Sequence, residues 1–357
     1  MPIPLVTAIV DTFNHETFIE QALNSVLDQG FSASDLEILV VDDGSTDRTS
    51  DILDKFAGRV RILRKQNGGQ GSAFNTAIPL ARGEIVAFLD GDDWWAKDKL
   101  ASVIAVFGGD PKIGVVGHGF YEVDERLERT LAIVPDSNQL VRLKVMKEGI
   151  AFRNIMCFLG TSRVAIRREI LDLVGPIPHA LEVEADEFMS TMAVAKSQAM
   201  LLQQPLTFYR LHAGNLYQFR GSDANKIRRK MTVLVELSAA LRRELPRALL
   251  NEDVINAVVE PINVEAQCLK LSLVGGTPWE TFQVERATMR LAYKQMNWKY
   301  RIFKYLVLTV TLLLPPTTYY KMRAYYAKMN LRRLRRFTGE PIPASSGQYY
   351  KPGADAK

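Results

Sequence analysis

The chain has 357 residues, 47% of them hydrophobic, which is enough for a sizeable core and long for one domain. Its two cysteines, Cys157 and Cys268, have no metal-binding or redox spacing and exclude a disulfide framework, so they indicate a reducing compartment. The formal net charge is +5, and we expect no secretory signal because no basic segment precedes the first apolar stretch.

The first part of the sequence alternates short apolar runs with segments of helical spacing. The apolar runs predict strands at residues 5–10, 37–41, 60–63 and 85–89. The segments between them predict helices at 16–27, 49–56 and 72–81. Such alternation predicts an α/β fold with a mostly parallel sheet flanked by helices. Ligands of such sheets bind beyond the carboxyl ends of the strands, where the polar clusters of this sequence lie.

Three carboxylates follow the strand predicted at 85–89. Asp90, Asp92 and Asp93 fall within four residues, and they repel one another unless a cation lies between them. Hard divalent ions such as Mg2+ and Mn2+ bind oxygen ligands of this kind. The alternative is a solvated acidic turn.

The second part of the sequence predicts further strands and then helices alone. Strands are expected at 113–117, 163–167 and 200–209, with another beginning at 119–124, and residues 125–150 are left unassigned. Helices are expected at 168–174 and 188–196, then at 226–244, 251–274 and 278–295. Pro246 and the pair Gly275-Gly276 are the predicted breaks.

Three motifs, in this order, resemble the family 2 glycosyltransferases of the GT-A (Rossmann-like) fold. They are VVDDGSTD at 40–47, NGG at 67–69 and FLDGDD at 88–93. The resemblance covers about residues 4–215. It implies a nucleotide-sugar donor, with UDP favoured by family habit, and a divalent cation. It also implies transfer to a saccharide or lipid-linked acceptor with inversion at the anomeric carbon.

The resemblance assigns donor and metal roles to residues of these motifs. Asp92 matches the direct metal ligand, and Asp90 matches the residue that faces the ribose or the metal. Asp43 matches the position that binds the uracil ring, and Thr12 and Asn14 match the loop near the base. Further matches are Gly69, whose turn a Cβ would block, His212 as a metal ligand and Arg210 as a diphosphate contact, within a YRxH-like segment at 209–212. A lone His is often structural, which is the alternative for His212.

The resemblance places the catalytic base in the acidic segment at 184–187. Asp186 matches the base position, but the local sequence EADE departs from the usual Glu-Asp form and leaves Glu187 as a second candidate. The alternative is that these acids only stabilise a helix N-terminus. Trp94 and Trp95 follow the metal motif, and we expect one to stack on a sugar and the other to fill the core.

The C-terminal part is strongly basic. Residues 286–339 contain thirteen Lys or Arg and no Asp or Glu, whereas residues 1–285 have a balance of −8. The apolar part of 302–316 is shorter than the roughly 20 residues of a membrane span. Its aromatic and basic residues predict peripheral association with the inner face of an anionic membrane, and the acidic active face argues against nucleic acid. The alternative is a core-packing helix followed by a solvated one.

We therefore expect four segments and consider three functions. The segments are a catalytic domain at 1–220, a helical extension at 221–298, a membrane-associating segment at 299–340 and a disordered tail at 341–357. The first function is a metal-dependent glycosyltransferase that adds single sugars, because the motif of processive synthases is absent. The others are a nucleotide-binding relative without turnover and a nucleotidyltransferase. The last usually has a glycine-rich phosphate loop where this chain has residues 11–14.

Overall fold

The computed structural model describes residues 4–124, 130–212, 224–292 and 298–328. The chain divides into two compact units. The N-terminal unit comprises Met1–Asn215 and Ala239–Ile255, and the C-terminal unit comprises Leu216–Ser238 and Asn256–Lys357. The predicted catalytic residues within the described ranges all belong to the N-terminal unit.

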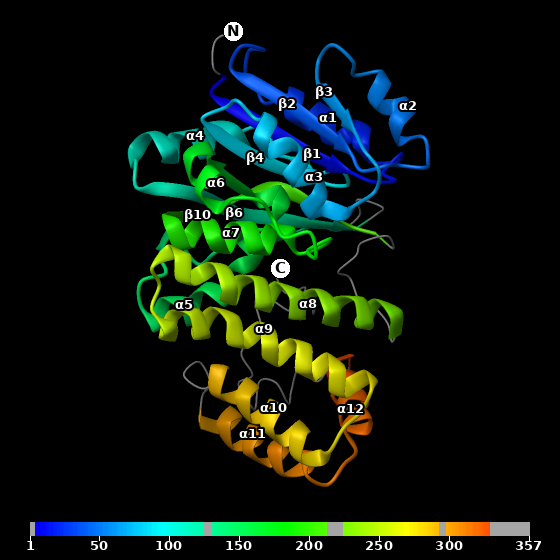
Figure 1. Cartoon of the computed structure of the whole chain (residues 1–357), viewed down its shortest axis with the longest axis vertical. Helices are drawn as coiled ribbons and strands as arrows, with labels where there is room; N and C mark the ends of the chain where they lie inside the picture. The colour runs from blue at the N-terminus through cyan, green and yellow to red at the C-terminus, as the bar shows by residue number, and fades with distance from the viewer. Residues whose placement is uncertain (1–3, 125–129, 213–223, 293–297, 329–357) are drawn as a thin grey trace, which may run out of the picture. The chain divides into compact units, whose positions relative to one another are not determined.

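Among the described residues, ten strands form one sheet in the N-terminal unit (Figure 1). The main strand order is β3-β2-β1-β4-β9-β6-β10-β5, with β7 on β6 and β8 on β10. The strands are β1 (Val6–Thr12), β2 (Leu36–Asp42), β3 (Arg61–Arg64), β4 (Ile85–Asp90), β5 (Trp94–Trp95), β6 (Ile113–Asp124), β7 (Thr130–Ile133), β8 (Gln139–Val141), β9 (Val164–Arg167) and β10 (Gln198–Leu211).

The predicted parallel arrangement is correct for the first four strands. β3, β2, β1 and β4 are mutually parallel, and the apolar residues of β4 are buried on both faces. Beyond β4 the sheet is mixed, because β9 runs antiparallel to both β4 and β6, and β5 pairs antiparallel with β10. A mixed second half is common where an α/β sheet carries added strands.

The two strands expected at 113–117 and 119–124 form one strand, β6. His118, at the expected break, is fully buried and pairs with β10, so the ladder continues through it. The unassigned residues 125–150 contribute β7, β8 and the start of α5, with 125–129 outside the described residues.

Helices cover both faces of the sheet. Alternate residues of β1, β2 and β4 pack with α1, α2 and α4 in one core cluster, as period-2 side-chain alternation requires. α3 contacts β1 and β2, and Phe74 of α3 packs edge-on against Phe88 of β4, on the other face. The helices of this unit include α1 (Ile19–Leu27), α2 (Thr49–Asp54), α3 (Gly69–Ala77), α4 (Lys99–Gly109), α5 (Met146–Arg153), α6 (Arg168–Val174) and α7 (Ala185–Lys196).

The three predicted C-terminal helices are present as α8 (Ala224–Glu244), α9 (Glu252–Leu273) and α10 (Pro278–Ala292). Two further helices follow them, α11 (Trp298–Thr311) and α12 (Pro316–Lys328). The breaks fall at Pro246 and Gly275-Gly276 as expected. Val264, Val284 and Tyr320 belong to a core cluster that joins α9, α10 and α12. No helix in the described ranges has an apolar stretch long enough to cross a bilayer.

Candidate active site

The candidate site lies at the carboxyl ends of β1, β2 and β4. Strand register places Asp11 beside Asp90 and Thr12 beside Asp42. Polar side chains therefore gather at one edge because each parallel strand ends there, as the sequence predicts.

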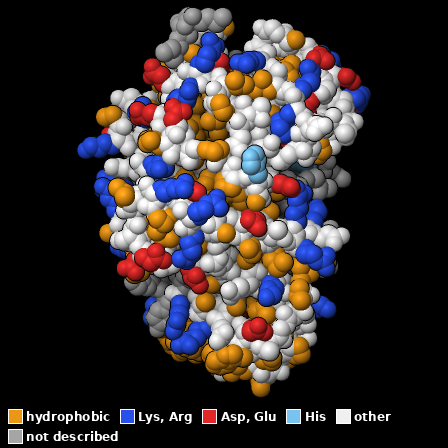
Figure 2. All heavy atoms as spheres, in the orientation of Figure 1, with side chains coloured by type: hydrophobic (Ala, Val, Ile, Leu, Met, Phe, Trp, Pro, Cys, Tyr) orange, Lys and Arg blue, Asp and Glu red, His pale blue; other side chains and the backbone are white. Residues whose placement is uncertain are grey.

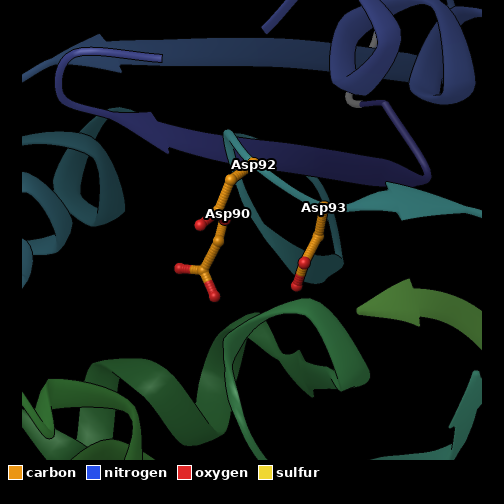
Figure 3. A group of neighbouring side chains, drawn as sticks. All are labelled: Asp90, Asp92 and Asp93. Carbon is orange, nitrogen blue, oxygen red and sulfur yellow. The ribbon is translucent and has the colours of Figure 1, made fainter. Parts of the chain in front are cut away.

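Asp90, Asp92 and Asp93 converge after β4. One carboxylate oxygen from each lies within 4.8 Å of the others, a spacing that could hold a metal ion. Figure 3 shows the carboxylates of Asp90 and Asp93 pointing the same way from the end of this strand. Nε2 of His212 lies 2.9 Å from Oδ2 of Asp92, and Nε2 of His15 lies 3.9 Å from the same oxygen. The predicted metal residues are therefore neighbours.

The two motif carboxylates differ in electrostatic environment. Burial, and then the charges of Asp11 and Asp92, raise the pKa of Asp90 well above its ordinary value. Burial also acts to raise the pKa of Asp92, but the hydrogen bond with His212 and the nearby His15 hold it below the ordinary value. Asp92 is therefore the carboxylate best kept in its charged form.

Asp93 also stabilises the turn that follows β4. Its side chain is almost fully buried, and its Oδ1 accepts a hydrogen bond of 2.9 Å from the backbone N–H of Arg210. Burial, and then the charge of Asp92, raise the pKa of Asp93 to about 7. This carboxylate joins the turn after β4 to β10.

The donor set fits a hard divalent cation. Asp90 and Asp92 offer the carboxylate oxygen atoms that Mg2+ and Mn2+ prefer. The imidazole of His212 beside Asp92 adds a nitrogen atom as a further ligand. Among the described residues, Oδ1 of Asp11 is buried without a hydrogen-bond partner and belongs to the same group of carboxylates. A positive ion would relieve the repulsion among these charges.

Asp43, the predicted uracil contact, lies under the glycine turn. Its carboxylate accepts hydrogen bonds from the backbone N–H groups of Gly68 and Gly69, at 3.1 and 2.7 Å, and from Nζ of Lys65 at 2.5 Å. Gly69 has φ +78°, and a Cβ there would lie 2.5 Å from the carbonyl oxygen of Glu182. This contact explains why the turn requires glycine.

Thr12 and Asn14 connect the first loop to its neighbours. Oγ1 of Thr12 lies 3.2 Å from Nδ1 of His15. Asn14 adopts a left-handed backbone with φ +56°, and its Oδ1 accepts a 2.8 Å hydrogen bond from the N–H of Thr46. The two loops that the resemblance places near the base are therefore braced against each other. Asp43, Thr12 and Asn14 remain predicted donor contacts.

The two candidate bases at the start of α7 have different partners. Oδ2 of Asp186 accepts hydrogen bonds from the N–H and Oγ1 of Thr161, at 3.0 and 3.2 Å. Glu187 instead forms an ion pair with Arg153 of α5, and both side chains are mostly buried. Glu184, the residue before α7, has a left-handed backbone with φ +59°. Such strain is concentrated at functional sites.

Arg210, the predicted diphosphate contact, is 4% exposed. Its Nε donates a 2.9 Å hydrogen bond to the carbonyl oxygen of Asp92, and its guanidinium lies over the rings of Phe18 and Trp94. In this arrangement Arg210 supports the metal-motif loop. Asn215, beyond His212, lies outside the described residues.

The two tryptophans after the motif have separate environments. Trp95 is buried in the core, and its Nε1 donates a 3.2 Å hydrogen bond to the carbonyl oxygen of Ser162. Trp94 is half-buried and stacks on Phe208 with ring centroids 4.9 Å apart. Trp94 is therefore the one that remains a predicted acceptor contact.

Several site residues were not predicted from the sequence. Asp11, His15, Gln70, Thr161 and Ser162 all contact the predicted residues. Position could have indicated Asp11 and His15, because they flank the first loop. The other three lie at a helix start or before a strand, and only tertiary structure brings them to the site.

Comparison with known proteins gives the family. The family model described as "Glycosyl transferase family 2" matches residues 7–174. The uncharacterized glycosyltransferase alr2836 of Nostoc sp. is 31% identical over 65% of this chain and 73% of its own. The uncharacterized glycosyltransferase EpsJ of Bacillus subtilis is 33% identical, over 48% of this chain and 50% of its own.

Among solved structures, TarS 1–349 of S. aureus in complex with UDP-GlcNAc aligns with a TM-score of 0.53 and 22% identity. The alignment covers 83% of this chain and 92% of the TarS chain, and it shows a shared GT-A fold. Fold, motifs and relatives agree, and the chain belongs to the family 2 glycosyltransferases, enzymes that transfer sugars from nucleotide-sugar donors.

Proposed function

We propose that this glycosyltransferase is cation-dependent and inverting, and that it moves a sugar from a UDP-sugar to a hydroxyl of a saccharide or lipid-linked acceptor. The observation that carries the proposal is that Asp186, at the start of α7, is connected to Asp90 by hydrogen bonds through Thr161 and Gln70. The carboxylate of Asp186 is thereby available as a base beside the cluster of carboxylates that could hold a cation. The TarS complexes with UDP-GlcNAc and UDP support UDP as the nucleotide.

Each residue has a role in this proposal. Asp90, Asp92 and His212 would hold Mn2+ or Mg2+, which when bound stabilises the negative charge of the departing diphosphate. Asp186 accepts the proton of the attacking hydroxyl, and hydrogen bonds from Thr161 orient its carboxylate. Asp43 faces the base of the nucleotide from beneath the glycine turn.

The ion pair with Arg153 favours Asp186 over Glu187 as the base. The ion pair directs the carboxylate of Glu187 toward Arg153 and fixes its orientation, so this carboxylate is already engaged within the protein. Asp186 accepts its hydrogen bonds from a neutral hydroxyl and a backbone N–H instead.

We also propose peripheral association with an anionic membrane surface through the C-terminal unit, on the cytoplasmic face. An apolar stripe of α11 is exposed, and it includes Trp298, Ile302, Leu306 and Val310. Figure 2 shows apolar side chains gathered over the part of the C-terminal unit where α10 and α11 lie. Exposed Lys and Arg of the same unit are suited to anionic headgroups, and they include Arg286, Arg290, Lys299 and Lys321.

Part of the segment predicted at 299–340 packs within the protein. Tyr319 and Tyr320 are buried in the core cluster of the C-terminal unit, so they are not available to a headgroup layer. The stripe on α11 takes their place in the proposal. The arginines at 332–336 and the tail at 341–357 lie outside the described residues.

A donor panel tests the reaction. Purified enzyme would be incubated with radiolabelled UDP-, GDP- and dTDP-sugars, with Mn2+, Mg2+ or EDTA, and with and without a bacterial membrane lipid extract. We expect Mn2+-dependent release of UDP that increases with the extract. Equal turnover in EDTA would contradict cation dependence, and turnover with GDP-sugars alone would contradict UDP.

A further inference from the structure

A continuous chain of hydrogen bonds joins Asp90 to Asp186. Nε2 of Gln70 donates to Oδ1 of Asp90 at 3.1 Å and to Oγ1 of Thr161 at 3.0 Å. Oγ1 of Thr161 in turn donates to Oδ2 of Asp186 at 3.2 Å, and its backbone N–H donates to the same oxygen at 3.0 Å. The side-chain amide of Gln70 has two N–H donors and the hydroxyl of Thr161 has one, so every side-chain donor of these two residues is used in this chain of hydrogen bonds.

Ser162 makes a separate pair of contacts with Asp90. Oγ of Ser162 accepts a 3.1 Å hydrogen bond from the backbone N–H of Asp90 and donates to its Oδ2 at 3.3 Å. Thr161 and Ser162 are each 1% exposed and lie side by side in a short 3-10 turn, η3 (Thr161–Arg163). Two adjacent residues therefore contact two different functional carboxylates.

Three hydrogen-bond donors fix the backbone of the η3 turn. The carbonyl oxygen of Ser162 accepts hydrogen bonds from Nε1 of Trp95, Nζ of Lys99 and Oγ1 of Thr207, at 3.2, 3.1 and 2.6 Å. These donors come from β5, α4 and β10, so the turn has little freedom to rotate. A side chain held this way can set the position of a neighbouring carboxylate with the accuracy that catalysis requires.

We propose that Thr161 and Ser162 are positioning residues with separate tasks. Thr161 orients Asp186 for proton transfer, and Ser162 orients Asp90 for binding of the donor and its cation. Gln70 links the two tasks by holding Asp90 and Thr161 together. The inference rests on the proposed function, in which Asp186 is the base and Asp90 belongs to the cation site.

The test compares two substitutions one residue apart. Thr161→Val keeps the shape of the side chain and the backbone N–H but removes the hydroxyl. We expect kcat to fall by about 10- to 100-fold, the effect of losing a hydrogen bond to a charged group. KM for the donor and the Kd of UDP with Mn2+ should stay within about twofold. Thr161→Ser restores the hydroxyl and should recover most of kcat.

Ser162→Ala should give the opposite pattern. Removing its hydroxyl releases Asp90, so we expect the Kd of UDP with Mn2+ to rise by about 5- to 20-fold, with a smaller change in kcat. Calorimetric titration with UDP and Mn2+ and steady-state kinetics give the two readouts. Thr191→Val is the matched control, because Thr191 is also fully buried on α7 and its hydroxyl has no partner among the described residues.

A merely structural role would change kcat and donor affinity together in both variants. That result, or wild-type kcat in Thr161→Val, would overturn the inference. Asp186→Asn separates this failure from failure of the proposed function. If Asp186→Asn is inactive while Thr161→Val matches the wild type, the base assignment stands and the positioning role is wrong. If Asp186→Asn is fully active, the base assignment itself is wrong.

Discussion

Asp11 on β1 lies in register with Asp90 on β4, so two carboxylates face the same strand edge from adjacent parallel strands. Burial, and then the charge of Asp92, raise the pKa of Asp11 well above its ordinary value. Its Oδ1 is buried, and no described group hydrogen-bonds to it. In the proposed function, the mutual repulsion of this cluster destabilises the fold when no cation is bound and provides affinity for the cation.

Asp11→Asn should separate these two effects. Removing one charge relieves repulsion with Asp90 and Asp92, so we expect the Tm of the N-terminal unit in EDTA to rise by about 2–4 °C, the shift that roughly 1 kcal/mol gives in a unit of about 150–250 residues. The increase in Tm on adding Mn2+ should become smaller than in the wild type, because a ligand that binds only the folded state stabilises it less when its affinity is lower. Thermal unfolding with and without Mn2+ measures both effects. An unchanged Mn2+ shift would exclude Asp11 from the cation site.

Asp186→Asn and Glu187→Gln should affect different properties. Loss of the base lowers kcat by about 10²–10⁴-fold and leaves donor affinity intact. Glu187→Gln removes the ion pair with Arg153, so we expect near-normal kcat and a stability loss of about 1.5–3 kcal/mol. Steady-state kinetics and urea unfolding on both variants give the comparison. A large kcat loss in Glu187→Gln with unchanged stability would reverse the assignment.

The sequence predicts the parallel half of the sheet well because each strand there is a short apolar run between turn residues. β4 is the clearest case, with five consecutive buried residues and the metal motif directly after it. It does not predict the mixed half, because β9 and β5 are short and their direction depends on partners far along the chain. His118 shows the same limit, since a polar residue inside β6 looked like a strand end.

The candidate site divides in the same way. Motif spacing finds Asp43, Asp90 and Asp92, because local sequence fixes their place at strand ends. It does not find Thr161 or Gln70, whose contacts with the carboxylates span 25 and 20 residues of sequence. The ion pair of Glu187 was also not predicted, since Arg153 is the last residue of α5, a helix that the sequence did not predict.

Lys99 gives a prediction for the pH dependence of stability. Burial, and then the charge of Arg163, lower the pKa of Lys99 well below its ordinary value, while Asp93 opposes this change. Between the folded pKa and the ordinary value of about 10.4, the unfolded chain binds more protons than the folded one, so stability rises with pH. Lys99→Met should remove this contribution.

Urea unfolding at pH 7, 8 and 9 measures the contribution of Lys99 to the pH dependence of stability. We expect the unfolding free energy of the wild type, relative to Lys99→Met, to increase with pH by at most about 1.4 kcal/mol per pH unit. Lys97→Met is the control, because Lys97 is exposed two residues away on the chain. A wild-type curve parallel to that of Lys99→Met would show that Lys99 keeps the same protonation in both states.

The α11 stripe predicts lipid binding that single substitutions can remove. Leu306 in the stripe and Leu313, two residues beyond the end of α11, are 62% and 79% exposed, and we expect both to enter the boundary between headgroups and acyl chains of an anionic bilayer. A glutamate at either position costs apolar contact and adds repulsion from anionic lipid. Flotation with vesicles of phosphatidylglycerol and phosphatidylcholine should therefore show loss of most binding in Leu306→Glu and Leu313→Glu. Raised salt should weaken wild-type binding.

Leu173→Glu is the matched control for this experiment. Leu173 is 60% exposed on α6 of the N-terminal unit, so it offers the same change at a similar exposure outside the stripe. We expect this variant to float as the wild type does. Equal loss in all three variants would mean that binding follows net charge alone, because the stripe would then contribute nothing of its own. Absence of wild-type flotation, with a dimer that Leu306→Glu dissociates in gel filtration, would identify a second copy of the chain as the partner of α11.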